Sequence, residues 1–218
     1  MTSRKSWPVA LTGIAAIVIG VVSGAVAGSS PDASDDSPRE IVRFYTEHDT
    51  RVAVSVGIGI VAVALLLFFA SYLKQVLDEA GAERSILPRV AFAGAVVLAT
   101  GLAIDATIQL TLIQTADDIS LAGSQALNAL YNNDYVPLGV GMALLVFSAG
   151  LSIVKHGGLP KWIGWVGIVF GLTAPTPVGF IAFVGGGLWI AVTSVVLALR
   201  ARKAVDGGDA APAAAAAR

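Results

Sequence analysis

Long uncharged apolar runs dominate this 218-residue chain and decide what it can fold into. A membrane-spanning helix needs about 20 apolar residues, because the hydrocarbon core of a bilayer is about 30 Å thick. The run from Val52 to Leu73 holds no charge and is the cleanest of them. Comparable runs cover residues 7–27, 90–114, 136–154 and 162–199. The chain is therefore predicted to be a polytopic, all-α membrane bundle.

Composition supports this prediction and excludes several other classes of protein. Only 13% of residues are charged and 56% are hydrophobic, whereas soluble domains are about 25% charged. This balance is the opposite of the one that favours disorder. A formal net charge of -1 offers no basic face for nucleic acid. The absence of cysteine excludes disulfides, iron–sulfur clusters and cysteine zinc sites.

The last apolar run is nearly twice the length of one span. Ala174-Pro-Thr-Pro177 interrupts it, and two closely spaced prolines favour a turn. We therefore expect a hairpin of two spans, at residues 162–173 and 178–199. The first of these is short, so we expect either that it begins inside the headgroup layer or that the turn lies below the membrane surface. The alternative is a single span with a re-entrant piece.

The first run, residues 7–27, also resembles a signal peptide. Arg4 and Lys5 precede it, and Ala25-Val-Ala27 fits a cleavage site. The run is longer than the usual apolar region of about 7–15 residues. Gly20, Gly24 and Gly28 would also place small residues on one helix face for close packing. We expect a retained span, with cleavage as the alternative.

Lysine and arginine residues indicate the orientation, because they concentrate on the cytoplasmic side. With six spans and the N-terminus inside, eleven of the fourteen fall in inner segments. The outer segments then hold only Arg39, Arg43 and Arg51. The loop from Thr115 to Tyr135 carries acids but no cation, as expected outside. The prediction is an N-in, C-in bundle.

The remaining segments divide the chain further. Residues 1–203 are expected to form one six-helix domain, and the Gly/Asp- and Ala-rich residues 204–218 a disordered cytoplasmic tail. Residues 28–51 form an outer loop that begins with a flexible acidic stretch. Within it, Ser37-Pro-Arg-Glu40 is typical of a capped helix start. We expect a short amphipathic helix on the outer membrane surface, acting as an anchor or as a lid over a cavity.

Asp105 is the only charged residue inside a predicted span. An ionisable group there costs about 2.5–3.5 kcal/mol on insertion scales. Gln109 follows four residues later and so shares its helix face. These two residues form the candidate intramembrane polar site. They either line a cavity as a proton- or cation-responsive group, or Asp105 makes an ordinary hydrogen bond between helices.

Other patterns predict no chemistry. His48 and His156 are expected on opposite sides of the membrane, so they cannot share a metal or a haem. Gly150-Leu-Ser152 is similar to a rhomboid-protease motif, but no span supplies a histidine to activate the serine. The glycines of residues 164–171 and 185–187 suit close helix contacts, although a broken helix at 185–187 is an alternative. We expect no catalytic residue, no metal and no cofactor.

Three segments also resemble a known family. They are the first span with its acidic linker, Glu40-Ile-Val-Arg-Phe-Tyr-Thr-Glu-His-Asp-Thr-Arg51, and Leu159-Pro-Lys-Trp-Ile-Gly-Trp-Val-Gly167. Together they resemble a group of actinobacterial six-span membrane proteins of unknown function, over residues 5 to 203. The resemblance implies the topology and a bacterial plasma membrane. It implies no catalytic or binding residue.

Two functional hypotheses follow. The first is a non-enzymatic accessory protein of the cell envelope, whose glycine-rich faces hold a membrane-protein partner or a second copy of the chain. The second is a small proton- or cation-linked carrier or channel, with Asp105 and Gln109 on the permeation path. They differ in one respect, since a carrier needs Asp105 to face a cavity and an accessory protein needs it sealed. Both need the lipid bilayer and neither needs nucleic acid.

Overall fold

The computed structural model describes residues 7–174 and 179–215, and the element bounds come from these residues. The described chain contains helices and turns, in the order α1 (Trp7–Ala10), α2 (Thr12–Ala27), α3 (Pro38–Glu47), α4 (Asp49–Leu77), a π-helical turn η2 (Asp78–Ala82), α5 (Leu87–Thr115), α6 (Leu121–Asn133), α7 (Tyr135–His156), α8 (Lys161–Thr173) and α9 (Gly179–Ala215). Five helical segments are long and apolar enough to cross a membrane. The expected all-α class is confirmed, and the chain is a membrane protein.

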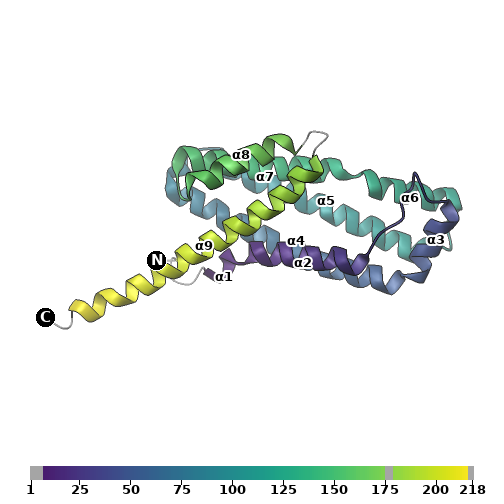
Figure 1. Ribbon diagram of the computed structural model, residues 1–218, viewed down its shortest axis with the longest axis horizontal. Coiled ribbons are helices and arrows are strands. Elements are labelled where there is room, and N and C mark those ends of the chain that lie inside the picture. Colours follow the sequence, from purple (N-terminus) through teal and green to yellow (C-terminus); the bar gives the residue numbers. More distant parts are fainter. Residues whose placement is uncertain (1–6, 175–178, 216–218) are drawn as a thin grey trace.

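The long helices α4 and α5 form an antiparallel pair joined through η2 (Figure 1). The sequence predicts that the second span continues for about two turns and breaks at Gly81. The break is confirmed, because Gly81 adopts φ 98°, a conformation that favours glycine. Each helix has 29 residues, about 43 Å at about 1.5 Å per residue, and so exceeds the hydrocarbon core.

The first span is kinked and is held by neighbouring helices. The hydroxyl of Ser194 on α9 donates to Ala10 O (2.5 Å) and accepts from Ile14 N (2.9 Å). It therefore stands in for the helical bond between these two residues, which separates α1 from α2. Further along, Ser23 Oγ donates to Ser55 O and Ser55 Oγ donates to Ser23 O, both at 2.8 Å. These bonds integrate the segment into the bundle.

The expected glycine face of the first span is wrong. A methyl group on Gly20 would have its nearest neighbour at 4.0 Å, and Gly24 has none within 4 Å. Close packing occurs at Gly13 instead, where an added methyl would lie 2.5 Å from the Phe69 ring. Near Gly20, α2 and α4 are further apart, since its nearest neighbour is Ala62 of α4.

Helices α5, α7 and α8 pack closely through five glycines, which we call the glycine seam. A methyl on Gly150 would lie 2.6 Å from Gly164 O, and one on Gly171 would lie 2.5 Å from Phe147 Cβ. Added methyl groups at the other members would collide with neighbouring residues in the same way. The seam consists of Gly94, Gly141, Gly150, Gly164 and Gly171. It confirms the predicted use of glycine for close contacts in the span at 162–173.

Helices α8 and α9 form the two arms of the predicted hairpin, while the turn at 175–178 lies outside the described residues. α8 has 13 residues, about 20 Å, and ends well short of the far end of α5 (Figure 1). α9 is continuous through Gly185 and Gly186, which pack on Phe170 and Met142, so the broken-helix alternative is wrong. The indole of Trp189 donates to Ile163 O at 2.7 Å.

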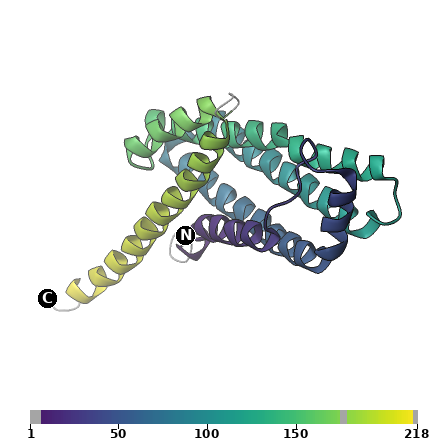
Figure 2. The same ribbon diagram turned by 45° about the vertical axis from the view of Figure 1, so that its right-hand side comes forward.

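α9 crosses the bundle and leaves it (Figures 1 and 2). The helix continues to Ala215, over much of the segment for which the sequence predicts a disordered tail. Alanine has the highest helix propensity, which favours continuation of a helix that is already formed. The position of residues 216–218 is outside the described range.

The opposite end of the bundle from η2 carries a small domain that we call the cap, made of residues 28–37, α3 and α6. α3 begins with the predicted capping box, because Ser37 and Glu40 each bond the other's backbone N–H. The sequence predicts that the apolar face of α3 lies on the membrane surface, but this face is buried inside the protein. Ile41 and Tyr45 are buried, 0% and 1% exposed, in a cluster with residues of α5. Protein rather than lipid covers this face because α6, which the sequence leaves as loop, folds against it.

Candidate functional site

A cavity of about 530 Å³ lies between two halves of the bundle. α2 and α4 form one side, and α5 and α7 form the other, with α9 crossing (Figure 2). This volume is within the range of about 300–1,000 Å³ usual for small-molecule sites. Its lining on α5 extends from Leu98 to Gln109, about 16 Å along the helix. The cavity is therefore elongated parallel to the helices.

The lining is apolar along most of this length. It consists of small and branched residues such as Val63, Leu66 and Leu102, with Phe183 from α9. Four polar residues line it, namely Ser23, Ser55, Asp105 and Gln109. The two serines bond each other across α2 and α4. Asp105 and Gln109 are the polar groups that remain available to an occupant.

Asp105 and Gln109 are brought together as the sequence predicts. Both lie on α5, four residues apart, and both line the cavity. The threonines of the same helix do not join them. Thr100, Thr107 and Thr111 donate to the carbonyls four residues earlier, at 2.8–2.9 Å. Their hydroxyls are thus satisfied by the backbone of their own helix.

Asp134 is the residue of the site that the sequence does not reveal. We expected it in an external loop, but α6 folds back antiparallel to α5, and Asp134 joins α6 to α7. Its carboxyl lies within hydrogen-bonding reach of the Asp105 carboxyl. Asp105 Oδ1 and Asp134 Oδ2 are buried and have no hydrogen-bond partner within the described chain. We call Asp105 and Asp134 the acid pair.

Tyr131 connects the acid pair to the cap. Its hydroxyl lies within hydrogen-bonding reach of Ser30 and close to both carboxyls. No lysine, arginine or histidine among residues 7–174 and 179–215 forms an ion pair with Asp105 or Asp134. Within these residues, the ion pair that does form joins Lys74 and Asp78 near η2, at 2.6 Å.

The cap closes over this region through amide side chains on one face of α6. Asn128, which is fully buried, accepts from Tyr45 Oη (2.9 Å) and donates to Pro31 O (3.0 Å). Asn132 also donates to Pro31 O, at 3.2 Å. Burial raises the pKa of the Tyr45 hydroxyl above its ordinary value, which keeps it a hydrogen-bond donor. The acidic linker predicted to be flexible is thus bonded to α6.

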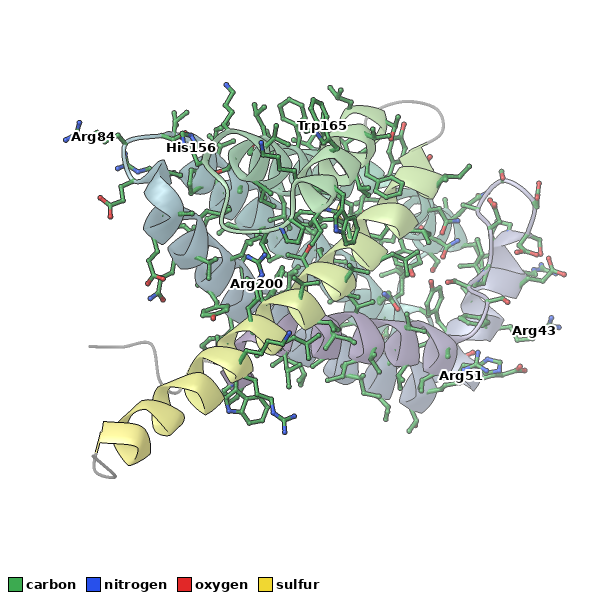
Figure 3. The ribbon with its side chains drawn as sticks, turned by 60° about the vertical axis from the view of Figure 1, so that its left-hand side comes forward. Arg43, Arg51, Arg84, His156, Trp165 and Arg200 are labelled. Atoms are coloured by element: carbon green, nitrogen blue, oxygen red, sulfur yellow. The ribbon has the colours of Figure 1, made fainter. Side chains whose placement is uncertain are left out.

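The other candidate residues do not form sites. His156 lies near Arg84, far from the end that carries Arg43 and Arg51 (Figure 3). His48 stacks on Phe44 at that second end, so the histidines are separated as expected. Groups of three or more metal-ligating residues are not found in the described part of the chain.

Ser152 also lacks the surroundings of a nucleophile. The side chain is completely buried, and its hydroxyl has no partner among the residues described. A serine nucleophile needs a general base within hydrogen-bonding distance. The neighbouring Lys155 lies one turn further on along the same helix, in the last turn of α7, where a lysine can extend its ammonium group towards solvent.

Comparison with known proteins gives no relative to guide the assignment. No protein-family model matches the chain, and neither a curated protein nor a solved structure does. The function must therefore be argued from the cavity and its residues.

The sequence alone identifies Asp105 as a site residue but does not identify Asp134. Asp105 is detectable because it interrupts an apolar run. Asp134 is not, because it lies beside Asn132 and Asn133 in a segment that reads as loop. One signal does exist, since Asp134 directly precedes an apolar run and so can begin a helix. How far Asp134 lies inside the bundle depends on the length of α5 and on how α6 folds back along it.

Proposed function

We propose that the chain is a six-span protein of a bacterial plasma membrane, with both ends in the cytoplasm. Five long apolar helices and the shorter α8 supply the spans. The cap, whose end of the bundle carries Arg39, Arg43 and Arg51 but no lysine, would face outward, and η2, with Arg84 and His156 near it, would face inward (Figure 3). The Ala-, Val- and Gly-rich composition and the resemblance to an actinobacterial family support the same location.

We infer that this protein binds a small molecule within the bilayer as a non-enzymatic carrier, with Asp105 and Gln109 in its binding site. The observation that carries the proposal is the cavity of about 530 Å³, which both residues line. Intramembrane acids that face a cavity mark substrate or proton paths more often than simple packing contacts do. The acid pair supplies a group that can gain or lose a proton as an occupant enters or leaves.

The accessory-protein hypothesis has less support. It relies on glycine-rich faces that bind a partner, but the glycines of α5, α7 and α8 are occupied within the chain. Gly185 and Gly186 of α9 likewise pack on Phe170 and Met142. Gly20 and Gly24 of α2 remain open to a partner, but they lie among exposed valines, and any membrane bundle presents such faces to lipid.

Cysteine labelling tests the carrier proposal, because the native chain has no cysteine. Gln109→Cys should react with a water-soluble maleimide added to one side of sealed vesicles. Two control variants define the limits: Ala149→Cys, fully buried on α7, and Val166→Cys on the exposed face of α8. Both should stay unlabelled, the first because it is packed and the second because lipid covers it.

The result decides between the hypotheses. Labelling at residue 109 from one side supports a cavity that solvent reaches. Absence of labelling from either side, in a variant that purifies as the folded protein, would overturn the carrier proposal. In that case purification in mild detergent, with identification of co-purifying chains, would test the accessory role.

A further inference from the structure

The polar residues of the cavity gather at one of its ends. Ser55, near the start of α4, and Gln109, towards the end of α5, line the end that lies nearer the cap. Leu66 and Leu98, farther from the cap along the same two helices, line the other end. The cavity is therefore amphipathic along its length, in the same sense as a lipid with its head towards the cap.

The cavity also opens sideways, between α2 and α9. The two helices are close where a methyl group added to Gly187 would lie 3.7 Å from Ile17 Cδ1, and from there they diverge (Figures 1 and 2). One turn further on, Val21 of α2 and Val184 of α9 line the cavity and are 68% and 49% exposed. Exposed aliphatic side chains within membrane spans are covered by lipid chains. The opening therefore faces lipid rather than water.

We propose that the cavity binds the single hydrocarbon chain of a neutral amphiphile with a hydroxyl head, which enters sideways from the lipid between α2 and α9. The chain lies along the apolar length, and the hydroxyl group lies at Asp105 and Gln109. This inference rests on the proposed ligand-binding role of the cavity. It names the class of the ligand and its route, which the carrier proposal leaves open.

The dimensions of the cavity favour one chain. The lining on α5 extends about 16 Å, a length that an extended chain of about a dozen atoms covers. At the opening, glycine provides the space, because methyl groups added to Gly20 and Gly187 would have their nearest neighbours at 4.0 and 3.7 Å. One narrow chain can pass there, whereas a lipid with two chains would require α2 and α9 to move apart.

The two polar side chains favour a hydroxyl head. The Gln109 amide, which can both donate and accept, makes no hydrogen bond within the described residues. A hydroxyl group donates to a carboxylate and accepts from a protonated carboxyl or an amide N–H, so it suits Asp105 in either state. A plain hydrocarbon would leave both side chains unpaired. A quaternary ammonium head neither donates nor accepts and would leave Gln109 unpaired.

Photocrosslinking of a chain probe tests the proposal. The probe is dodecanol with a diazirine at the end of its chain, added to the full-length protein in vesicles of a zwitterionic phospholipid. After irradiation, mass spectrometry identifies the crosslinked residues, which we expect near Leu66 and Leu98, at the deep end of the cavity. Plain dodecanol in excess should compete. Dodecane and dodecyltrimethylammonium should compete about tenfold less well, since they lose one or two hydrogen bonds.

A pair of glycine variants tests the route. Gly20→Phe places a ring at the opening, where the cavity has room for it, and should reduce crosslinking at the deep end to background. Gly24→Phe is the matched control, because Gly24 lies one turn further along the same face of α2 and does not line the cavity. Crosslinking in this control should equal the wild type. Thermal unfolding checks that both variants are folded.

A pair of glutamine variants tests the head. Gln109→Leu keeps the size of the side chain and removes its hydrogen bonds, so dodecanol should lose its advantage over dodecane as a competitor. Gln114→Leu, at an exposed position on α5 outside the cavity lining, should retain that advantage. This comparison remains decisive should Gly20→Phe fail to fold.

The outcomes separate this inference from the proposed function. Equal crosslinking in Gly20→Phe and Gly24→Phe overturns the sideways route, and equal competition by dodecane or the ammonium probe overturns the hydroxyl head. The carrier proposal would survive either result if Gln109→Cys is labelled. Crosslinking as expected, with that cysteine unlabelled, would keep the chain site and overturn the carrier role. No crosslinking inside the cavity, together with an unlabelled cysteine, would overturn both.

Discussion

The two sides of the bundle are held together in different ways. On one side α5, α7 and α8 meet through the glycine seam, where no side chain could be added without a collision. On the other side α2 and α4 face α5 and α9 across the cavity, and the helices are linked at its margins by serine hydrogen bonds. Helix association in lipid depends on close packing and on such bonds, because burial from water gives no driving force there.

The contrast explains where a binding site can form. Glycine on both partners allows the backbones to approach closely and leaves no volume. A hydroxyl-linked pair such as Ser23 and Ser55 fixes two helices at one point and constrains the surrounding residues less. The seam therefore serves as the rigid part of the bundle, and the cavity lies where packing is least complete.

Gly141→Leu in the seam should have the largest effect. An added side chain would collide with the backbone of Leu98, so we expect unfolding to become easier by at least about 3 kcal/mol, the upper end for overpacked cores. Gly24→Leu is the control, because nothing lies within 4 Å of Gly24. Thermal and denaturant unfolding in detergent compares them. Similar stability of the two variants would contradict the distinction between seam and cavity side.

Asn128→Ala in the cap should cost about 1–3 kcal/mol. The substitution leaves the buried Tyr45 hydroxyl without its partner and removes the shorter of the two hydrogen bonds to the Pro31 carbonyl. The expected result is faster proteolysis of residues 28–37 and lower stability. Asn132→Ala removes one exposed bond to the same carbonyl and should change either quantity little. Equal proteolysis of both variants would show that these bonds do not hold the cap.

Ala106→Leu tests the free volume of the cavity directly. Its added carbons enter space that is empty of protein atoms, so stability should stay within about 1 kcal/mol of the wild type. The same change at Ala149, which is 0% exposed on α7, should cost about 1–3 kcal/mol. Chemical denaturation measures both. A larger loss at residue 106 than at residue 149 would reverse the comparison.

The smallest effect expected is a pH dependence confined to the cap. Hydrogen bonds from the Ser37 side chain and backbone lower the pKa of Glu40 below its ordinary value of 4.5. A lowered folded-state pKa gives stabilisation that is present above that ordinary value and is lost as the pH falls below it. The protection of the α3 amides, relative to their intrinsic exchange rates, should therefore decrease on acidification from pH 5 to pH 3. In Glu40→Gln that decrease should be absent, and protection in the seam should stay unchanged over this range in both proteins.

Local patterns predicted much of this fold. Apolar runs predicted the long helices. Gly81 predicted the break after α4, and the Ser37 to Glu40 pattern predicted the start of α3. These features depend on hydropathy, on backbone conformation at one residue, or on contacts within four residues. A sequence carries such information directly, because the interacting groups are neighbours along the chain.

Other features depended on contacts between distant segments. The kink at Leu11 requires Ser194, some 180 residues away. The burial of α3 requires α6, and the acid pair requires α6 to return along α5 until Asp134 reaches Asp105.

The sequence by itself determined that this is a helical membrane protein with one acid inside a span. Bilayer thickness and the cost of burying charge are enough to establish both points. Only the tertiary structure decided that the acid lines a cavity and has a second carboxyl beside it. Both facts depend on how closely each helix pair packs, and that distance is set by side chains from two or more helices at once.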